Sequence, residues 1–379
     1  MTATMEPSQA GPVLLLTAGM GAGHDGVASE LERRLAERGI PSATLDMWEL
    51  LPLGLGRVIT GFYRSMIQNF PWMYEAIYRI WLEPRHNDPG RVSPVVRLAG
   101  RRLARRIAAD RPVLALSTFH LSSQVLGDMR RRAALDIPVV SVVVDFAAHR
   151  LWVNPGVDLH LCLHPAQAQR MAERGATRTA APGPIVRPEF VGLRWDRGAA
   201  RRSLGLGDDD RVVLIVAGSW GAGRVTSTVE TVAADGRFVP VVVAGSNRRL
   251  QRVTGRVAGA VVLGWVDDMD RLLAAADVMV ENAGGLTAME AMAAGTPVVS
   301  YQPIPGHGRA NVIRMEEAGV SRYARSPAEL LALLDELVAG GPLRERLTGA
   351  ARAAFRSDAA DCIQALTRSP GGQRLARAP

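Results

Sequence analysis

Short runs that are apolar at nearly every position recur along this chain and constrain its fold most strongly. Runs of this kind, without the polar alternation of a half-exposed strand, are typical of strands buried on both faces of a parallel sheet. The first series comprises residues 13–17, 43–46, 113–117 and 139–144. Helical patterns rich in Ala, Arg and Glu lie between them, for example at residues 24–37 and 94–109. This alternation predicts an α/β fold with a doubly wound sheet.

The pattern breaks once and then starts again. Three prolines and a glycine interrupt residues 181–188, which suits a linker between domains. A second series of expected strands follows at residues 212–217, 239–243, 260–263, 278–280 and 298–301. We therefore expect an N-terminal domain over residues 1–188, a C-terminal domain over 189–358, and a helix and tail over 359–379 that pack back toward the first domain. A ligand would lie in the cleft between the domains.

Composition narrows the classes of function. The two cysteines, Cys162 and Cys362, are far apart and outside any metal-ligand spacing, so neither a disulfide framework nor a metal site is expected. All 45 basic residues are arginine, and the lack of lysine excludes a Walker phosphate loop and Schiff-base chemistry. No apolar run approaches the ~20 residues that cross a bilayer, and no signal-peptide pattern begins the sequence. We expect a cytoplasmic protein.

Residues 48–111 combine a surplus of arginine with many of the aromatic residues. The aromatic residues of this stretch are Trp48, Phe62, Tyr63, Phe70, Trp72, Tyr74, Tyr78 and Trp81. Rings and arginines together suit a lipid headgroup interface, where Arg meets lipid phosphate. The same residue types stack on single-stranded nucleic acid. Packing of these rings in the core of the first domain is an equal alternative.

A glycine turn, Gly19-Met-Gly-Ala-Gly-His24, directly follows the first expected strand. A dinucleotide fingerprint requires Gly or Ala at the sixth position, where this chain has His24. Asp46 ends the next strand, as the ribose-binding acid of a dehydrogenase would. Because of His24, a Rossmann dehydrogenase is nevertheless disfavoured. A histidine at the rim of the cleft suits a general base, because its usual pKa is near ~6.5. Capping of the helix is the structural alternative, and the sequence leaves both open.

Two glycine turns of the second half suit a nucleotide diphosphate. The turn over residues 217–223 would present backbone N–H groups and the Ser219 hydroxyl to phosphate. Residues 281–290, Glu-Asn-Ala-Gly-Gly-Leu-Thr-Ala-Met-Glu, are more specific. Two glycines there join a strand to a helix, so free amides and the helix dipole would face pyrophosphate. One turn on, the Glu290 carboxylate would accept both ribose hydroxyls, and its apolar neighbours argue against a merely solvated position.

In their order along the chain, the motifs resemble those of monogalactosyldiacylglycerol synthase-like enzymes. These enzymes belong to glycosyltransferase family 28, together with the peptidoglycan enzyme MurG. The motifs are GMGAGH at 19–24, VDFAAH at 144–149, PIVRP at 184–188, GSWGAG at 218–223, GSN at 245–247, GWVDD at 264–268, AGGLTAMEAMAAGTPVV at 283–299 and PIPG at 303–306. The resemblance covers about residues 13–340, and the motifs are specific as a set.

The resemblance implies a GT-B fold, in which two Rossmann-like domains face a cleft, and inverting transfer from a UDP-sugar without metal or other cofactor. It also implies that the first domain attaches peripherally to a membrane and that His24 is the general base or orients the acceptor. The candidate nucleotide and diphosphate ligands are Gly218, Ser219, Gly221, Gly245, Trp265, Val266, Gly284, Gly285, Thr287 and Glu290. Weaker candidates for sugar or acceptor contact are Gly23, Asp145, His149, Pro305, Gly306 and His307. For Asp145 and His149, a structural hydrogen-bonded pair is an equal alternative.

Two positions depart from the family pattern. After PIPG the plant-type sequences have Gln-Glu, whose side chains meet the sugar, whereas this chain has His307-Gly308, so the transferred sugar stays open. Val144 stands where the family usually has threonine. Asp268-Met-Asp270 could be mistaken for the metal-binding DxD of another glycosyltransferase fold, but its place before a helix favours capping.

Together these features predict a hexosyltransferase that moves a sugar from a UDP-sugar to a lipid such as diacylglycerol, at the inner face of an anionic membrane. Transfer to a soluble natural-product aglycone and nucleotide-sugar epimerisation are the alternatives within enzymes. Nucleic-acid binding would rest on the basic net charge of +8 and the Arg-rich stretch, and it would leave the second domain without a purpose. The sequence does not specify the oligomeric state.

Overall fold

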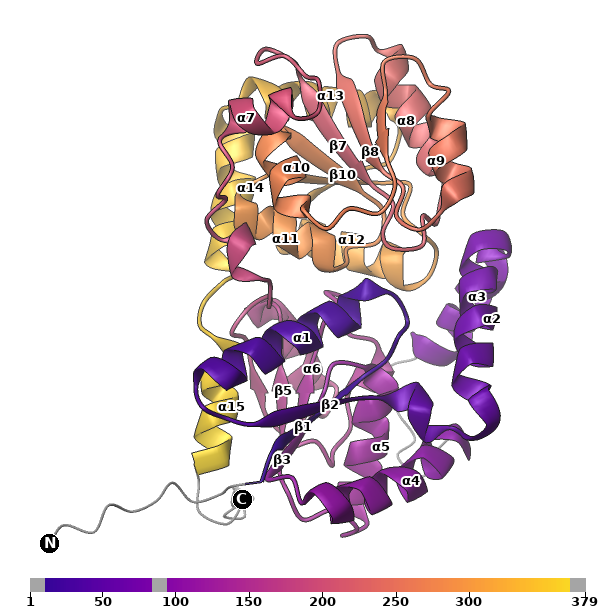
Figure 1. Cartoon of the computed structure of the whole chain (residues 1–379), viewed down its shortest axis with the longest axis vertical. Coiled ribbons are helices and arrows are strands. Elements are labelled where there is room, and N and C mark those ends of the chain that lie inside the picture. Colours follow the sequence, from indigo (N-terminus) through magenta and orange to yellow (C-terminus); the bar gives the residue numbers. More distant parts are fainter. Residues whose placement is uncertain (1–10, 84–93, 369–379) are drawn as a thin grey trace, which may run out of the picture.

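The computed structural model describes residues 11–83 and 94–368. They form two α/β domains that lie one above the other in Figure 1, each built on a six-stranded parallel sheet flanked by helices. The doubly wound fold expected from the sequence is confirmed.

The first domain holds the sheet with strand order β2-β1-β3-β4-β5-β6. Its strands are β1 (Val13–Thr17), β2 (Ser42–Asp46), β3 (Leu114–Ser117), β4 (Val139–Val142), β5 (Leu159–Leu161) and β6 (Thr179–Ala180). Its helices are α1 (Ala22–Glu37), α2 (Leu55–Asn69), α3 (Pro71–Ile77), α4 (Pro94–Asp110), α5 (His120–Arg131) and α6 (Pro165–Glu173). Four short turns of other helix types complete it, η1 (Met47–Leu50), η2 (Pro52–Gly54), η3 (Tyr78–Leu82) and η4 (Arg150–Trp152).

The second domain holds the sheet with strand order β12-β11-β10-β7-β8-β9. Its strands are β7 (Val212–Val216), β8 (Val239–Val243), β9 (Val261–Leu263), β10 (Val278–Glu281), β11 (Val298–Tyr301) and β12 (Arg322–Ala324). Its helices are η5 (Pro188–Phe190), α7 (Arg197–Arg202), α8 (Val225–Ala234), α9 (Arg248–Thr254), α10 (Met269–Ala275), α11 (Leu286–Ala294), α12 (His307–Glu317), α13 (Pro327–Ala339) and α14 (Pro342–Ala353). Helix α15 (Ala359–Arg368) follows and lies against the first domain.

Strand β1 shows why the apolar runs form these sheets. Val13 and Leu15 pack into one buried cluster with α1, whereas Leu14 and Leu16 pack into a second cluster with α4 and α5. Side chains alternate between the two faces of a strand, and both faces here are covered. All five residues of β1 are therefore buried, which explains the absence of polar alternation in the sequence.

Between β2 and α4 the chain leaves the sheet and forms the α2–α3 hairpin, which rises beside the sheet toward the second domain (Figure 1). The aromatic residues of this stretch divide between two environments. Trp48, Tyr74 and Tyr78 are buried, whereas Phe62 and Trp72 are 59% and 71% exposed. Neither core packing nor surface exposure alone describes the stretch.

The chain crosses between the domains twice, and the two crossings lie together. Gly183 of the first crossing has φ +111, and a Cβ there would lie 2.1 Å from the Ala354 carbonyl oxygen of the second crossing. The Arg356 N–H donates to the Pro182 carbonyl at 2.8 Å. This close backbone contact is possible only because residue 183 is glycine.

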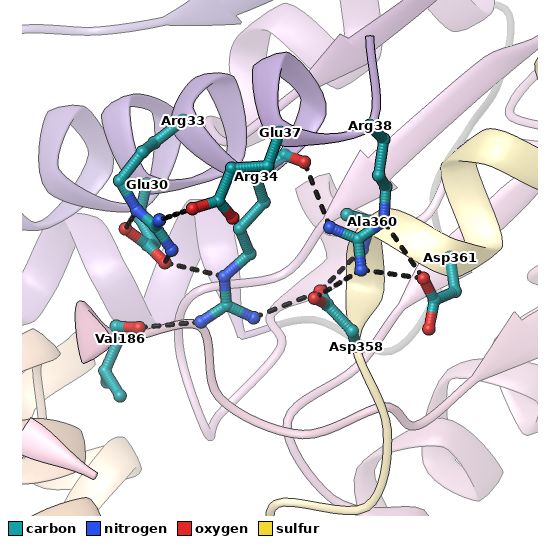
Figure 2. Close-up of polar contacts among 9 residues, drawn as sticks. All are labelled: Glu30, Arg33, Arg34, Glu37, Arg38, Val186, Asp358, Ala360 and Asp361. Carbon is teal, nitrogen blue, oxygen red and sulfur yellow. Dashed lines mark hydrogen bonds and ion pairs between the residues drawn. The ribbon is translucent and has the colours of Figure 1, made fainter. Parts of the chain in front are cut away.

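An arginine–carboxylate network fixes the C-terminal helix α15 on α1 (Figure 2). Asp358 accepts from Arg34 Nη1 at 3.1 Å and from Arg38 Nη2 at 2.7 Å, and Asp361 accepts from Arg38 Nε at 3.0 Å. Arg34 also donates to the Val186 carbonyl in the first crossing, at 2.7 Å. The network therefore joins α1, the linker and the end of the chain.

Candidate active site

Glycine turns from the two domains face each other across the domain boundary. A Cβ on Gly21 would lie 3.5 Å from Ser219 Oγ, and a Cβ on Gly23 would lie 3.9 Å from Leu286 Cβ. One turn further along α1, a Cβ on Gly26 would lie 2.7 Å from Leu286 Cδ2. The N-termini of α1 and α11 therefore approach one another at the carboxyl ends of the two sheets, where α/β proteins bind ligands.

His24 lies in the first turn of α1 with its ring orientation fixed. Its Nδ1 is 2.6 Å from the Thr118 carbonyl oxygen, and its ring makes an edge contact with Phe119 at 5.1 Å between centroids. Because a carbonyl oxygen only accepts, Nδ1 carries the proton and Nε2 keeps the lone pair of a base. No side chain caps α1, whose N-cap is Gly21. The capping alternative for His24 is therefore excluded.

Three further histidines lie in the same region as His24, and two of them, His120 and His149, contact the Trp152 ring that His24 also contacts. His120 packs on His149 with ring centroids 4.6 Å apart, and His307 lies on the second domain at the start of α12. Burial lowers the pKa of His149 to about 4, and it also lowers the pKa values of His120 and His307. His120 was missed by the sequence analysis. Its position soon after β3, at the same sheet edge as His24, was the available signal.

Asp145 and His149 do not form the hydrogen-bonded pair considered from the sequence. Asp145 Oδ1 accepts from Asn311 Nδ2 of α12 at 3.1 Å, and His149 Nδ1 accepts from the Leu151 N–H at 3.3 Å. Asn311 Oδ1 also accepts from the Ala147 N–H at 2.8 Å. The loop after β4 is therefore joined to the second domain.

A pocket that is open to solvent lies at this part of the domain boundary. Its lining residues in the first domain are Tyr78, Glu83, Ala147, Ala148, His149, Gln167, Arg170 and Arg174, and those in the second are Ala310 and Arg314. Both domains therefore form its walls.

A buried carboxylate holds the diglycine turn before α11 through hydrogen bonds. Glu281 accepts from the N–H groups of Ala283 and Gly284 and from the Ser300 hydroxyl. Burial raises the pKa of Glu281, against these hydrogen bonds. Gly284 has φ +62, and a Cβ there would lie 2.7 Å from Asn311 Cβ, so this glycine is packed inward. A Cβ on Gly285 would meet nothing within 4 Å.

The N-terminus of α11 is consequently the open part of this motif. The helix begins at Leu286, so the amides of Leu286 and Thr287 have no acceptor within the helix, whereas the Ala288 N–H donates to the Gly285 carbonyl at 3.0 Å. Such amides, aligned with the helix dipole, form an anion site. Of the two glycines expected to face pyrophosphate, Gly285 has open space beside it, whereas the Gly284 amide is already bonded.

Glu290 lies one turn beyond Thr287 and is 8% exposed. Burial raises its pKa to about 7, Arg187 of the linker opposes this rise, and Glu189 adds to it. Within residues 11–83 and 94–368 its carboxylate has no hydrogen-bond partner. A desolvated carboxylate without donors is a position where a ligand with two hydroxyls would be stabilised.

The turn over residues 218–223 packs on the turn that begins at Gly245. A Cβ on Gly221 would lie 2.5 Å from Asn247 Cβ, and a Cβ on Gly245 would lie 2.4 Å from the Gly218 carbonyl oxygen. These two glycines therefore permit close packing of the turns. A Cβ on Gly218 would meet nothing within 4 Å, and Ser219 is half-buried beside it, facing Gly21.

Trp265 and Val266 follow β9 at the same sheet edge. Trp265 is 56% exposed, and its Nε1 donates to Asp267 at 2.9 Å. The capping role expected for the nearby acidic pair is wrong, because Asp268 makes no side-chain cap of α10 and instead pairs with Arg271, while Asp270 pairs with Arg194. Among the residues that the structure describes, no three His, Cys, Asp or Glu side chains are grouped so as to hold a metal ion. In the same residues, no helix has the length and hydropathy to cross a membrane.

Comparison with known proteins places these features in a family context. Residues 24–182 match the family model for monogalactosyldiacylglycerol (MGDG) synthase, and residues 239–354 match that for glycosyl transferases group 1. A processive diacylglycerol beta-glucosyltransferase of Bacillus subtilis is 27% identical over 341 residues, which are 86% of this chain and 87% of the relative. That of Bacillus thuringiensis is 26% identical over 363 residues, 93% of this chain and 92% of the relative.

Solved structures share the fold at low identity. The glycosyltransferase of kitacinnamycin superposes with a TM-score of 0.63 at 19% identity and covers 95% of this chain and 100% of its own. MurG of Acinetobacter baumannii superposes with a TM-score of 0.56 at 16% identity, over 94% of this chain and 99% of its own.

The fold, the facing glycine turns and these similarities define the class: the chain is a GT-B glycosyltransferase, and its activity is that of a hexosyltransferase. Within that class, residues 24–182 are similar to monogalactosyldiacylglycerol synthases, the family that the motifs resemble.

Proposed function

We propose that this enzyme transfers a hexose, with inversion, from a UDP-sugar to the free hydroxyl of diacylglycerol or a closely related lipid. The observation that supports this most directly is the geometry of His24, whose ring is fixed through Nδ1 in the first turn of α1, next to glycines that approach Leu286 at the start of α11. The relatives from Bacillus are named diacylglycerol glucosyltransferases. A single hydroxyl acceptor needs one base, and His24 supplies it.

In the proposed reaction, His24 Nε2 takes the proton of the acceptor hydroxyl as its oxygen bonds to the anomeric carbon of the sugar. The bond between that carbon and the β-phosphate oxygen breaks, and UDP leaves with the electron pair. Charge develops on the diphosphate as it leaves. The open amides at the N-terminus of α11 and the Ser219 hydroxyl lie where they would stabilise it without a metal ion.

The donor half of the site extends along the second domain. We propose that Gly218, Ser219, Gly285 and Thr287 bind the diphosphate, and that Glu290 accepts both ribose hydroxyls. The backbone at Trp265 and Val266 would bind the base edge. Gly221, Gly245 and Gly284 contribute by close packing that shapes these turns, rather than through free amides.

The acceptor half includes the pocket beside His149 and a lipid-facing surface on the α2–α3 hairpin. Large apolar side chains are exposed along residues 53–81, which comprise η2, the hairpin and η3: Leu53, Leu55, Val58, Phe62, Phe70, Trp72, Ile80 and Trp81. Exposed apolar patches of this kind mark interaction sites, and rings near arginines suit a headgroup layer. Arg97, Arg101 and Arg105 on α4 are exposed and would meet anionic headgroups. We propose peripheral attachment to the inner face of the cell membrane.

Product analysis tests this function. The purified protein is incubated with vesicles that contain diacylglycerol and with a panel of UDP-hexoses, and the lipid fraction is analysed by mass spectrometry. A hexosyl diacylglycerol is the expected product. Transfer only to a soluble aglycone, or conversion of the UDP-hexose to an epimer without acceptor, would overturn the proposal. Flotation with anionic and neutral vesicles tests the membrane contact separately.

A further inference from the structure

The α2–α3 hairpin belongs to the first domain by sequence, but its buried face packs on the second. Met66, Ile67, Tyr74 and Tyr78 form a separate buried cluster, and the residues packed against it include Ala222 and Ala310 of the second domain. Gln68 Nε2 donates to the Trp220 carbonyl at 2.8 Å, next to the proposed diphosphate turn. The hairpin therefore bridges the two domains.

Helix α3 makes its most direct contacts with the turn that precedes α12, residues 303–307. Glu75 Oε2 accepts from the Gly306 N–H at 2.7 Å, and Glu75 Oε1 pairs with Arg309. The Tyr74 hydroxyl and His307 Nδ1 are 2.8 Å apart. A Cβ on Gly306 would lie 2.6 Å from Tyr74 Cε1, so the tyrosine ring lies directly on the turn.

The Glu75 carboxylate is held in its charged form. Burial favours the neutral acid, but hydrogen bonds from Arg309, from the Gly306 amide and from Arg79 outweigh it, and the pKa of Glu75 is lowered. At neutral pH, α3 is therefore joined to the turn and to α12 by an ionised carboxylate that accepts hydrogen bonds from both.

The turn lacks the side chain that would otherwise interact with the sugar from within the second domain. Position 308 is glycine, and a Cβ there would lie 2.3 Å from Ile304 Cγ1 and 3.2 Å from the Asn282 carbonyl oxygen. A larger residue does not fit unless Ile304 moves. Within the second domain the Ile304 N–H donates to the Asn282 carbonyl at 2.8 Å and the Arg309 N–H donates to the Ile304 carbonyl at 2.9 Å. Helix α3 adds the contacts to Gly306 and His307 from outside the domain.

The same short helix also carries an exposed apolar side chain, and another lies just before it. Trp72 is 71% exposed and Phe70, which precedes the helix, is 49% exposed. Less than one helical turn separates Trp72 from Tyr74 and Glu75. A surface that binds Trp72 and Phe70 would therefore restrict the motion of the residues that hold the turn.

We propose that Glu75 and Tyr74 are positioning residues through which the lipid-bound hairpin orders the turn at the sugar end of the donor site. Lipid binding would then raise the affinity for a UDP-hexose but not for UDP. This inference rests on the proposed function, which puts lipid beside the hairpin, and on the resemblance that makes Pro305, Gly306 and His307 candidates for sugar contact.

Titration calorimetry with the full-length protein tests the coupling without requiring transfer. Binding of a UDP-hexose and of UDP is measured with and without anionic vesicles that lack diacylglycerol. Vesicles should tighten UDP-hexose binding about fivefold and leave UDP binding unchanged. In Glu75→Gln the tightening should disappear and KM for the donor should rise about tenfold with little change in kcat, while vesicle flotation stays intact. Glu49→Gln, at an exposed position of η1, is the matched control.

Tyr74→Phe removes only the hydroxyl that meets His307 and should reduce the tightening to about half while the ring stays in place. Thermal unfolding of each variant checks that the fold is retained. Equal UDP-hexose binding with and without vesicles in the wild type, or wild-type coupling in Glu75→Gln, would overturn this inference and leave the proposed function standing. A protein that binds no UDP-hexose under any condition would overturn both.

Discussion

Two strand–turn–helix units face each other in this protein, and the same local architecture supports different chemistry in each. The turn before α1 carries His24, an ionisable side chain whose ring is fixed by the Thr118 carbonyl. The turn before α11 has no ionisable side chain in its first turn and is shaped by the buried Glu281. In the proposed mechanism, the first unit therefore supplies a base, and the second supplies open amides at the start of α11 to an anion. The residues that support each turn decide between the two functions.

Removing the base should give the largest effect on activity. His24→Ala should lower kcat by about 10³-fold, within the range for loss of a general base, and leave UDP binding within a factor of two or so. Steady-state kinetics and calorimetry measure the two quantities. His164→Asn, a histidine that caps α6 through its Nδ1, keeps a capping side chain and serves as the control. Activity of His24→Ala close to that of the control would remove His24 from the mechanism.

Removing the support of the second turn should affect stability as well as binding. Glu281→Ala leaves the N–H groups of Ala283 and Gly284 and the Ser300 hydroxyl without their acceptor. Burying such groups unpaired costs about 3 kcal/mol or more in the free energy of unfolding. Denaturant unfolding should show this loss, and UDP binding should weaken. A variant of wild-type stability that still loses UDP binding would place Glu281 in direct contact with the ligand instead.

The second unit includes Glu290, whose ionisation should make both stability and ligand binding depend on pH. Its folded-state pKa of about 7 lies above the ordinary value of 4.5. The protonated form is therefore stabilised by folding, and that stabilisation, about 3 kcal/mol, is lost as pH rises through 7. Glu290→Gln cannot ionise, so without ligand its melting temperature should exceed that of the wild type at pH 8 and match it at pH 5.

Ligand binding should show the opposite trend, since ribose hydroxyls donate to the ionised carboxylate. UDP-hexose affinity of the wild type should rise from pH 6 to pH 8, and Glu290→Gln should bind about tenfold more weakly at pH 8. Calorimetry across this range measures both, with Glu230→Gln on the exposed face of α8 as the control. A parallel pH profile in Glu290→Gln would contradict the ribose assignment.

The sequence predicted the features that are local to one strand, turn or helix. The run at residues 13–17 is β1 as expected, and His24 lies in the first turn of the helix that follows. β5, β6 and β12 were not predicted, because each has only two or three residues with a polar one among them, so no apolar run forms, unlike in the equally short β9. The sequence also could not predict which amides of the diglycine turn are free. The Gly284 N–H donates to the Glu281 carboxylate, and the sequence pattern gives no indication that this side chain folds back onto the turn.

Contacts between domains were the least predictable part. Glu75 and Gly306 are 231 residues apart and meet only because the α2–α3 hairpin reaches the second domain. The composition of that stretch indicated an interface but gave no sign that one face would hold the turn before α12. His120 shows the same limit, because its role follows from the packing of β3 beside β1 rather than from its own neighbours in sequence.

The smallest effect is expected at the place where the two units face each other. Ser219 Oγ has no hydrogen-bond partner among the described residues, and it lies beside Gly21 across the boundary. One hydrogen bond to a phosphate oxygen contributes about 1 kcal/mol, so Ser219→Ala should weaken UDP binding about fivefold and leave stability unchanged. Ser29→Ala, on the exposed face of α1, is the matched control for calorimetry. If Ser219→Ala instead lowers kcat without affecting UDP binding, the hydroxyl acts on the acceptor together with His24. In that case the turns of the two domains would not be divided strictly into one that supplies a base and one that binds the diphosphate.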